Sequence, residues 1–196
     1  MSRRGFTLIE LLLALAAFSV VGVALAASLR TGYRVWVAGE AAGRAMQEAR
    51  RNLENLGVEL RNSIDVPGRG FEGGSEILSF DTSEGGAQPG LARLTYGPDP
   101  ARGVLVRLSE PYGRAPRSRV LSSGPAALSF AYPFREPGDP SAESVVWSDR
   151  WPGPERPRAV RVSLTLVDAR GSPHGFVKVA WLPGGVWKKP GAEAAP

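Results

Sequence analysis

The chain has 196 residues, a formal net charge of +5 and no cysteine. Without cysteine there is neither a disulfide framework nor a thiolate metal site, so packing and backbone hydrogen bonds must stabilise the fold. The mild excess of positive charge permits an acidic partner but does not require one.

The first thirty residues join a short basic leader to an apolar segment of membrane length. The pair Arg3-Arg4 precedes the junction Gly5-Phe6, and Leu11–Leu29 contains no charged residue. As a helix, these 19 residues would span about 28 Å, close to the roughly 30 Å hydrocarbon core of a bilayer. Glu10 stands directly before this segment, where an ionisable group is costly unless it has a partner.

Three interpretations of the N-terminus and its Glu10 are open from the residues alone. The N-terminus could be a secretory signal cleaved near Ala24-Leu25-Ala26, although its apolar region exceeds the usual length of about 7–15 residues. Glu10 could complete a capping box with Thr7, three residues earlier. It could also have a functional partner, and this third interpretation is compatible with the second.

The run Arg4-Gly5-Phe6-Thr7-Leu8-Ile9-Glu10, followed by leucine and alanine, resembles the class III signal of type IV pilins and pseudopilins. The resemblance implies that a prepilin peptidase cuts after Gly5, that Phe6 is N-methylated, and that Glu10 pairs with the N-terminus of a neighbouring subunit. Glu10 would then set the axial register of an assembly. The basic leader, residues 1–5, stays cytoplasmic by the positive-inside rule. We therefore expect a single-pass protein of the bacterial inner membrane, with its C-terminal domain in the periplasm or on the cell surface.

The helical pattern continues beyond the apolar segment. We expect a transmembrane and assembly helix over residues 6–29 and an amphipathic half-helix over residues 30–62, with Tyr33 and Trp36 at the membrane–water boundary. In the second half, apolar residues recur at steps of three and four: Met46, Ala49, Leu53, Leu56 and Leu60. Pro67-Gly68 would stop the helix.

From residue 75 the apolar period changes to two, which predicts an antiparallel β domain over residues 75–183 followed by a loose tail, 184–196. The fold class is therefore α+β, a pilin-like fold in which a long N-terminal helix packs on an antiparallel sheet. We expect a short hairpin loop at Asp168–Ser172. The predicted strands are Glu76–Asp81, Ala92–Tyr96, Gly103–Leu108, Arg119–Leu121, Ala127–Tyr132, Ser144–Trp147, Ala159–Val167 and Gly175–Leu182.

Later segments resemble the J-type minor pseudopilins of type II secretion, especially Trp147-Ser148-Asp149-Arg150-Trp151-Pro152 and Pro157-Arg158-Ala159-Val160. This resemblance implies a structural subunit at the tip of a pseudopilus that primes assembly with other minor and major pseudopilins and contacts exported substrate protein. The tip subunit of the K type lacks the acid and has a large helical insertion, unlike this chain. A W-type minor pilin of a type IV pilus, which serves twitching, adhesion or DNA uptake, is the alternative.

We expect no cofactor, no metal and no enzymatic activity. The G-x-G-x-x-G match at 68–73 follows a helix and precedes a strand, the reverse of a dinucleotide site, so we interpret it as a flexible loop. Asp81 with Glu84, or Asp149 with Glu155, could ligate a hard cation, but the spacing lacks a dense acidic loop. The single histidine, His174, falls in a predicted surface loop and argues against a His-based triad.

Two further groups could contact partners. Arg114, Arg117 and Arg119 near Tyr112 form a small basic run that could touch nucleic acid, with a solvated loop as the alternative. Trp147, Trp151, Trp181 and Trp187 could anchor an interface, although core packing accounts equally well for Trp147 and Trp181. An exported enzyme anchored by its signal would need a site where several polar residues converge, and the sequence gives no convincing candidate for such a site.

Overall fold

The computed structural model describes residues 7–84, 90–122, 126–135, 145–168 and 171–190. The chain divides into two compact units, Met1–Arg44 and Ala45–Pro196. Helix α1, Leu8–Arg61, contributes to both units, and its ends lie within two residues of the outer ends of the two expected helical segments, 6–29 and 30–62. Its last turn closes with a bond from the Asn62 N–H to the Val58 carbonyl oxygen, and the chain then turns into a strand.

In the first unit the helix is apolar and its described side chains are almost all exposed. The stretch Leu8–Glu40 is long and apolar enough to cross a membrane, and within the described part of the chain it is the one helix that meets this criterion. An isolated helix that is hydrophobic on all sides does not suit water, so it requires lipid or other apolar helices around it.

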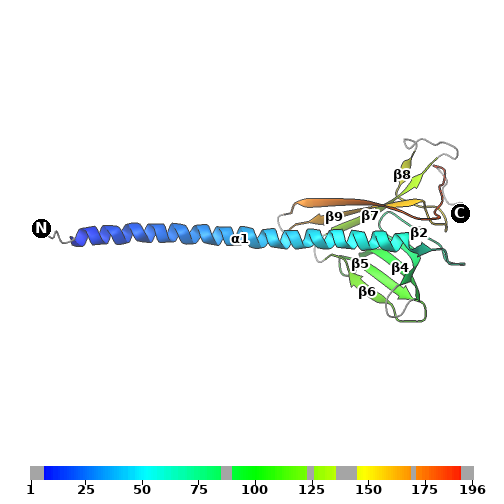
Figure 1. The fold of residues 1–196 in the computed structure, drawn as a ribbon, viewed down its shortest axis with the longest axis horizontal. Helices are drawn as coiled ribbons and strands as arrows, with labels where there is room; N and C mark the ends of the chain where they lie inside the picture. The colour runs from blue at the N-terminus through cyan, green and yellow to red at the C-terminus, as the bar shows by residue number, and fades with distance from the viewer. Residues whose placement is uncertain (1–6, 85–89, 123–125, 136–144, 169–170, 191–196) are drawn as a thin grey trace. The chain divides into compact units, whose positions relative to one another are not determined.

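The second unit contains two antiparallel β-sheets (Figure 1). In the first sheet the strand order is β1-β3-β4-β5-β6, with β2 paired to β3. Its strands are β1 Ser63–Ile64, β2 Glu72–Gly73, β3 Leu78–Glu84, β4 Gly90–Asp99, β5 Val104–Pro111 and β6 Arg117–Val120.

The second sheet has the order β10-β9-β7-β8. Its strands are β7 Ala126–Phe134, β8 Val146–Ser148, β9 Ala159–Val167 and β10 Pro173–Trp181. Strands β9 and β10 pair from Ala159↔Trp181 to Val167↔Pro173, as the predicted hairpin requires. The α+β class and the antiparallel pairing are confirmed, but the expectation of a single sheet is wrong. Alternation tells which side chains point inward and does not tell which strands become neighbours.

All of the predicted strands are present: Ala159–Val167 has the predicted ends and the others have shifted ends, although Ser144, the expected start of one, lies outside the described residues. Two short strands, β1 and β2, were not predicted. Each has only two residues, too few to show an alternating pattern.

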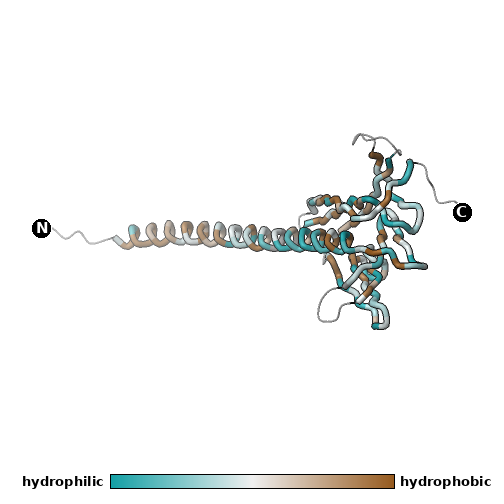
Figure 2. Tube along the Cα trace, turned by 45° about the vertical axis from the view of Figure 1, so that its right-hand side comes forward, coloured by the Kyte–Doolittle hydropathy of each residue, from teal (hydrophilic) through white to brown (hydrophobic). Residues whose placement is uncertain are grey.

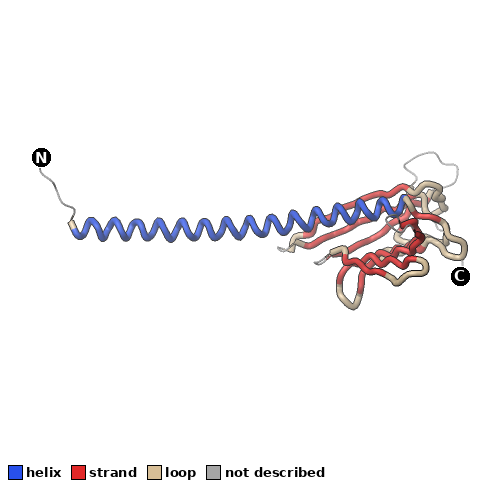
Figure 3. The backbone as a smooth tube through the Cα atoms, turned by 60° about the horizontal axis from the view of Figure 1, so that its bottom comes forward, coloured by secondary structure: helices blue, strands red, loops and turns tan. Residues whose placement is uncertain are grey.

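The core of the second unit lies where one face of α1 meets both sheets (Figures 1 and 3). Four of the five predicted helix residues are buried there, whereas Met46 is partly exposed. The helix side is formed by Ala49, Leu53, Leu56 and Leu60, the first-sheet side includes Phe80, Leu94 and Tyr96, and the second-sheet side includes Phe130, Val162 and Leu164.

Polar side chains on the helix fix its rotation against the sheets. Glu59 accepts hydrogen bonds from Tyr96 of β4 and, at 2.9–3.2 Å, from Arg107 of β5. Burial raises the pKa of the Tyr96 hydroxyl, and the Glu59 carboxylate raises it further, so Tyr96 remains a donor. On the other flank, Lys178 of β10 lies 2.5 Å from Glu54.

The helix–sheet contact can be tested by truncating one core residue. Leu56 is 2% exposed, so Leu56→Ala should lower the free energy of unfolding by about 2–5 kcal/mol through lost burial and a residual cavity. Val58 is 44% exposed on another face of the same helix, and Val58→Ala should change stability by no more than about 0.5 kcal/mol. Denaturant unfolding of the full chain in detergent, followed by near-ultraviolet circular dichroism, measures both, and equal losses would contradict this packing.

Candidate functional site

Glu10 closes a capping box at the start of α1. The Thr7 backbone N–H and the Thr7 hydroxyl each donate to Glu10 Oε2 at 3.2 Å, and the Glu10 N–H donates to Thr7 Oγ1 at 3.3 Å. This confirms the sequence-based prediction of a cap and satisfies orphan donors of the first turn. Because an ionised carboxylate can accept about four hydrogen bonds, the cap leaves Glu10 capacity for a further donor.

The predicted cleavage site and methylation site, Gly5 and Phe6, lie outside the described residues. Thr7, the first described residue, stands next to Phe6 in the chain. An amine at the start of a chain beginning with Phe6 would therefore be only a few residues from Glu10 of its own chain. The cap occupies Oε2 with Thr7, so it offers that carboxylate a local partner before any second subunit is present.

Two hydroxyls in the apolar half of the helix bond back to the helix backbone. Ser19 donates to the Leu15 carbonyl oxygen at 2.8 Å, and Thr31 donates to that of Ala27 at 3.0 Å. Such back-bonding hides polar groups within the helix. The surface that remains is apolar on all sides, as the hydropathy colouring of the helix shows (Figure 2).

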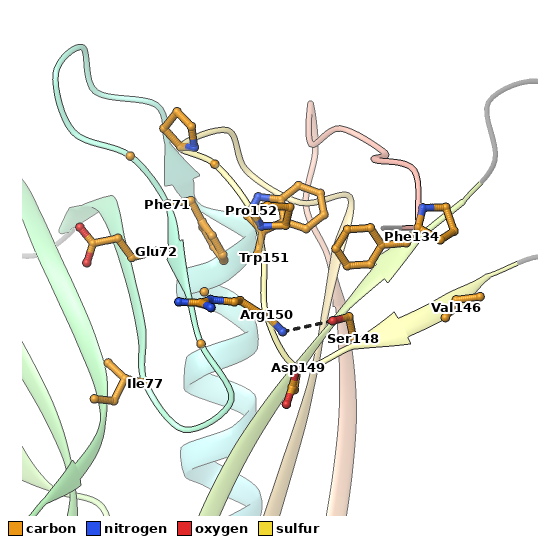
Figure 4. A pocket seen from close by; sticks show the side chains of 16 residues that line it. Phe71, Glu72, Ile77, Phe134, Val146, Ser148, Asp149, Arg150, Trp151 and Pro152 are labelled. Carbon is orange, nitrogen blue, oxygen red and sulfur yellow. Dashed lines mark hydrogen bonds between the residues drawn. The ribbon is translucent and has the colours of Figure 1, made fainter. Parts of the chain in front are cut away.

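A groove of about 1260 Å³ is open on the surface of the second unit (Figure 4). It is lined by the segment around β2, by the end of β7 and by the residues that follow β8. Phe71, Phe134 and Trp151 are almost fully buried beneath it, whereas Asp149 and Arg150 are exposed at its wall. Glu72, the other acid of the lining, is 2.7 Å from Arg93. No group of three or more histidine, cysteine or acidic residues suited to a metal occurs in the described ranges.

The candidate cation ligands have other partners. Asp81 is buried and is held at 2.9 Å by Arg93 and at 3.1 Å by the Tyr112 hydroxyl. Glu155 is 2.8 Å from Lys188, and the hydrogen bond from Lys188 holds the pKa of this carboxyl below its usual value. The side chain of Glu84 lies outside the described residues. Asp81 and Glu155 thus each form an ion pair with a basic side chain of the fold.

The tryptophans divide differently from the expectation. Trp151 is 4% exposed, and its indole N–H donates to the Glu155 carbonyl oxygen at 2.6 Å, so it belongs to the core. Trp181 is 55% exposed, so core packing was the wrong account for it. Its ring contacts that of Trp187, with centroids 6.4 Å apart. Trp147 is half-buried beneath the guanidinium of Arg161, 4.7 Å from the ring centroid.

Two predicted loops are corrected by the structure. His174 lies in strand β10, not in a loop, and its Nε2 is 3.1 Å from Asp168 Oδ2. The segment 68–73 is not a free loop, because Phe71 is buried and its N–H donates to the Pro154 carbonyl oxygen at 2.8 Å. A Cβ at Gly73 would lie 2.6 Å from the Tyr132 ring, so glycine is required there for packing.

The predicted basic run is partly engaged in the fold. Arg117 and Arg119 lie on strand β6, and Arg119 donates to Asn52 of α1 at 2.9 Å. Tyr112 is bound to Asp81 and lies under the guanidinium of Arg69. Of this group, Arg119 and Tyr112 thus have structural roles.

The comparison with known families supports the N-terminal site. Residues 1–26 match the family model described as the prokaryotic N-terminal methylation motif. No curated protein and no solved structure matches the chain. The N-terminus is thus that of a type IV pilin-like prepilin, which implies processing by a prepilin peptidase and assembly with other pilins. The exposed face of β10, described below, carries no linear motif and could be recognised only after the strands were paired.

The processing step gives a direct prediction. Mass spectrometry of the mature chain should find N-methylated Phe6 at its start, because we expect a prepilin peptidase to remove residues 1–5. Gly5→Val, which places a branched side chain at the cut, should leave the full precursor in the membrane. A mature terminus near Ala27 or Ser28 would instead show an ordinary secretory signal.

Proposed function

We propose that this protein is a structural assembly subunit without enzymatic activity: a minor pseudopilin of the J type that primes a type II secretion pseudopilus at its tip. The observation that carries the proposal is the methylation motif at 1–26, continued by an apolar helix that needs neighbours outside its own chain. Other pseudopilins would cover this helix in the assembly, and the inner membrane would hold it before assembly.

Glu10 would fix the axial position of neighbouring subunits along the apolar surface of the helix. A carboxylate and an ammonium group placed together in an apolar environment cost far less free energy than either alone. An N-terminal amine of a neighbouring subunit, displaced by one step along a helical assembly, would meet Glu10 at a single axial offset. The capping box does not compete with this role, since Glu10 Oε2 accepts the Thr7 bonds and the carboxylate retains capacity for the amine.

Support for the J type comes from the segment between Trp147 and Val160. The residues that carry this resemblance have structural roles: Trp151, Pro157 and Val160 are all buried. These buried residues determine how the end of the second sheet packs. A chain with the same residues at these positions is therefore expected to have the same local fold. The twitching, adhesion and DNA-uptake pili use the same N-terminal chemistry, and for that reason the host phenotype is the discriminating observation.

Glu10 is the residue to change first. Glu10→Leu should insert in the membrane normally but should lose most of its crosslinking to partner pseudopilins, because the only directional contact of the apolar helix is gone. Thr7→Val is the matched control: it removes the cap hydroxyl, at a cost of about 1 kcal/mol to the helix end, and keeps the carboxylate. Normal assembly of Glu10→Leu would refute the register role. Equal loss in both variants would assign the effect to the cap.

Deletion of the gene in its host distinguishes the two machines. Loss of protein export, restored by the wild-type gene and not by Glu10→Leu, is the expected result. Intact export with loss of twitching or DNA uptake would reject the secretion pseudopilus and favour the minor pilin.

A further inference from the structure

The second sheet has an outer face of which the described chain leaves a large part exposed, although Ala159 and Pro133 are buried at one end of it. Residues of one parity along β7, β9 and β10 point into the core, among them Phe130, Val162 and Ala180. The opposite parity forms the outer face, and the strand register places these residues in rows: Ser129↔Ser163↔Val177 and Ala131↔Arg161↔Val179, with Ala159↔Trp181 beside them. Small, apolar and aromatic side chains thus make up most of this face.

Strand β10 forms the edge of this sheet. In the described sheet its one neighbour is β9, because the order is β10-β9-β7-β8. The Leu182 N–H donates to the Arg158 carbonyl oxygen at 2.9 Å, and the Asp168 N–H donates to that of Ser172 at 3.0 Å. The backbone groups of the even-numbered β10 residues therefore bond to β9. Because bonded and non-bonded residues alternate in an antiparallel ladder, the N–H and C=O groups of Val177, Val179 and Trp181 point toward the open edge.

The same three residues present exposed apolar side chains. Val177 is 66% exposed, Val179 37% and Trp181 55%, and Trp187 extends the row by its contact with Trp181. Proteins usually protect such edges with outward charges, proline or bulges. The lysine of β10, Lys178, points instead toward α1, where it pairs with Glu54, and burial against Gly57 keeps it there. Over Val177–Trp181, therefore, none of these protective features occurs among the residues that the structure describes.

The charge around this edge defines the partner. Strands β7, β8, β9 and β10 contain no aspartate or glutamate. Arg161 lies on the outer face, and Arg135 lies over the Trp187 ring, 5.7 Å from its centroid. Two acids lie nearby and both are engaged: Glu54 of α1 by Lys178, and Asp168 by His174 and by the Ser172 N–H. A second copy of this sheet would bring only further positive charge, whereas a partner with carboxylates would be attracted.

We propose that the β10 edge binds an extended strand of another protein, one whose apolar side chains lie beside Val177, Val179 and Trp181 and whose flanking carboxylates meet Arg135 and Arg161. Backbone bonds to the edge would supply affinity, and the side-chain row with its charged border would supply specificity. This surface is distinct from the N-terminal site, so it stands whichever pilin-like assembly the protein serves.

Labelled peptides test the proposal on the full mature chain in detergent micelles, by fluorescence anisotropy. The probe has three valines alternating with threonines and two glutamates at each end, a symmetrical design that suits either strand direction. We expect saturable binding. The Val177, Val179 and Trp181 amides should also exchange hydrogen more slowly when the peptide is bound. A peptide with lysines in place of the glutamates should bind at least about tenfold more weakly, equivalent to about 1.4 kcal/mol.

Two variants locate the binding site. Val179→Pro removes an outward N–H without removing a bond to β9, and Val177→Glu places on the edge a carboxylate that repels the glutamates of the probe; each should weaken binding about tenfold or more. Val177→Thr is the matched control and should bind almost as the wild type does. Unchanged folding of each variant is checked by near-ultraviolet circular dichroism.

Three outcomes would overturn the proposal. These are absence of binding by the wild-type chain, equal binding of the basic peptide, and equal binding of the acidic peptide by Val177→Glu. Self-association of the chain that Val179→Pro abolishes would replace the acidic partner with a second copy and would also refute the proposal as stated. None of these outcomes bears on Phe6 methylation or on the Glu10 variants.

Discussion

The second unit depends on a single shared contact, the burial of one helix stripe against two sheets. Leu53, Leu56 and Leu60 are each at most 6% exposed, and a fully buried side chain of this size contributes about 1.5–3 kcal/mol. Each sheet has an apolar inner face that would otherwise meet water. The helix therefore acts as the common core element, and the two sheets hold each other in place largely through it and through the aromatic residues around it.

Those aromatic residues explain how two separate sheets form one core. A series of ring contacts, with centroids 5.4–6.4 Å apart, runs from the first sheet to the second: Tyr96, Phe80, Phe71, Tyr132, Trp151 and Phe134. Phe71 is the link, because it contacts Phe80 of β3 and Tyr132 of β7. The polar flanks of the helix then set its rotation, with Glu59 facing the first sheet and Glu54 the second.

Local patterns in the sequence predicted the buried stripe of the helix and the strands, but they did not predict the division into two sheets. The steps of three and four from Ala49 to Leu60 located the helix stripe, and the alternation of Val160, Val162 and Leu164 located a half-buried strand, because both signals come from neighbours in the chain. The division into two sheets depends on pairings between distant segments, which no period encodes. Phe71 was missed because a glycine-rich segment suggests a loop, and its burial depends on contacts with residues far along the chain.

The N-terminal site and the β10 edge also differed in how far the sequence alone could predict them. Gly5, Phe6 and Glu10 form a linear motif, so the sequence alone could single them out, and the capping box followed from the spacing of Thr7 and Glu10. The β10 edge could not be found in this way. Lys178 and Trp181 lie on opposite faces of β10, but the sequence does not tell which of these faces points inward. The contact between Lys178 and Glu54 of α1 answers that question. An apolar helix surface can associate with many similar helices, and in the proposed assembly Glu10 would restrict it to one axial offset. An unprotected strand edge requires a partner of matching backbone and charge, so selective recognition of partners would reside in the β domain while the helix serves the contacts common to all subunits.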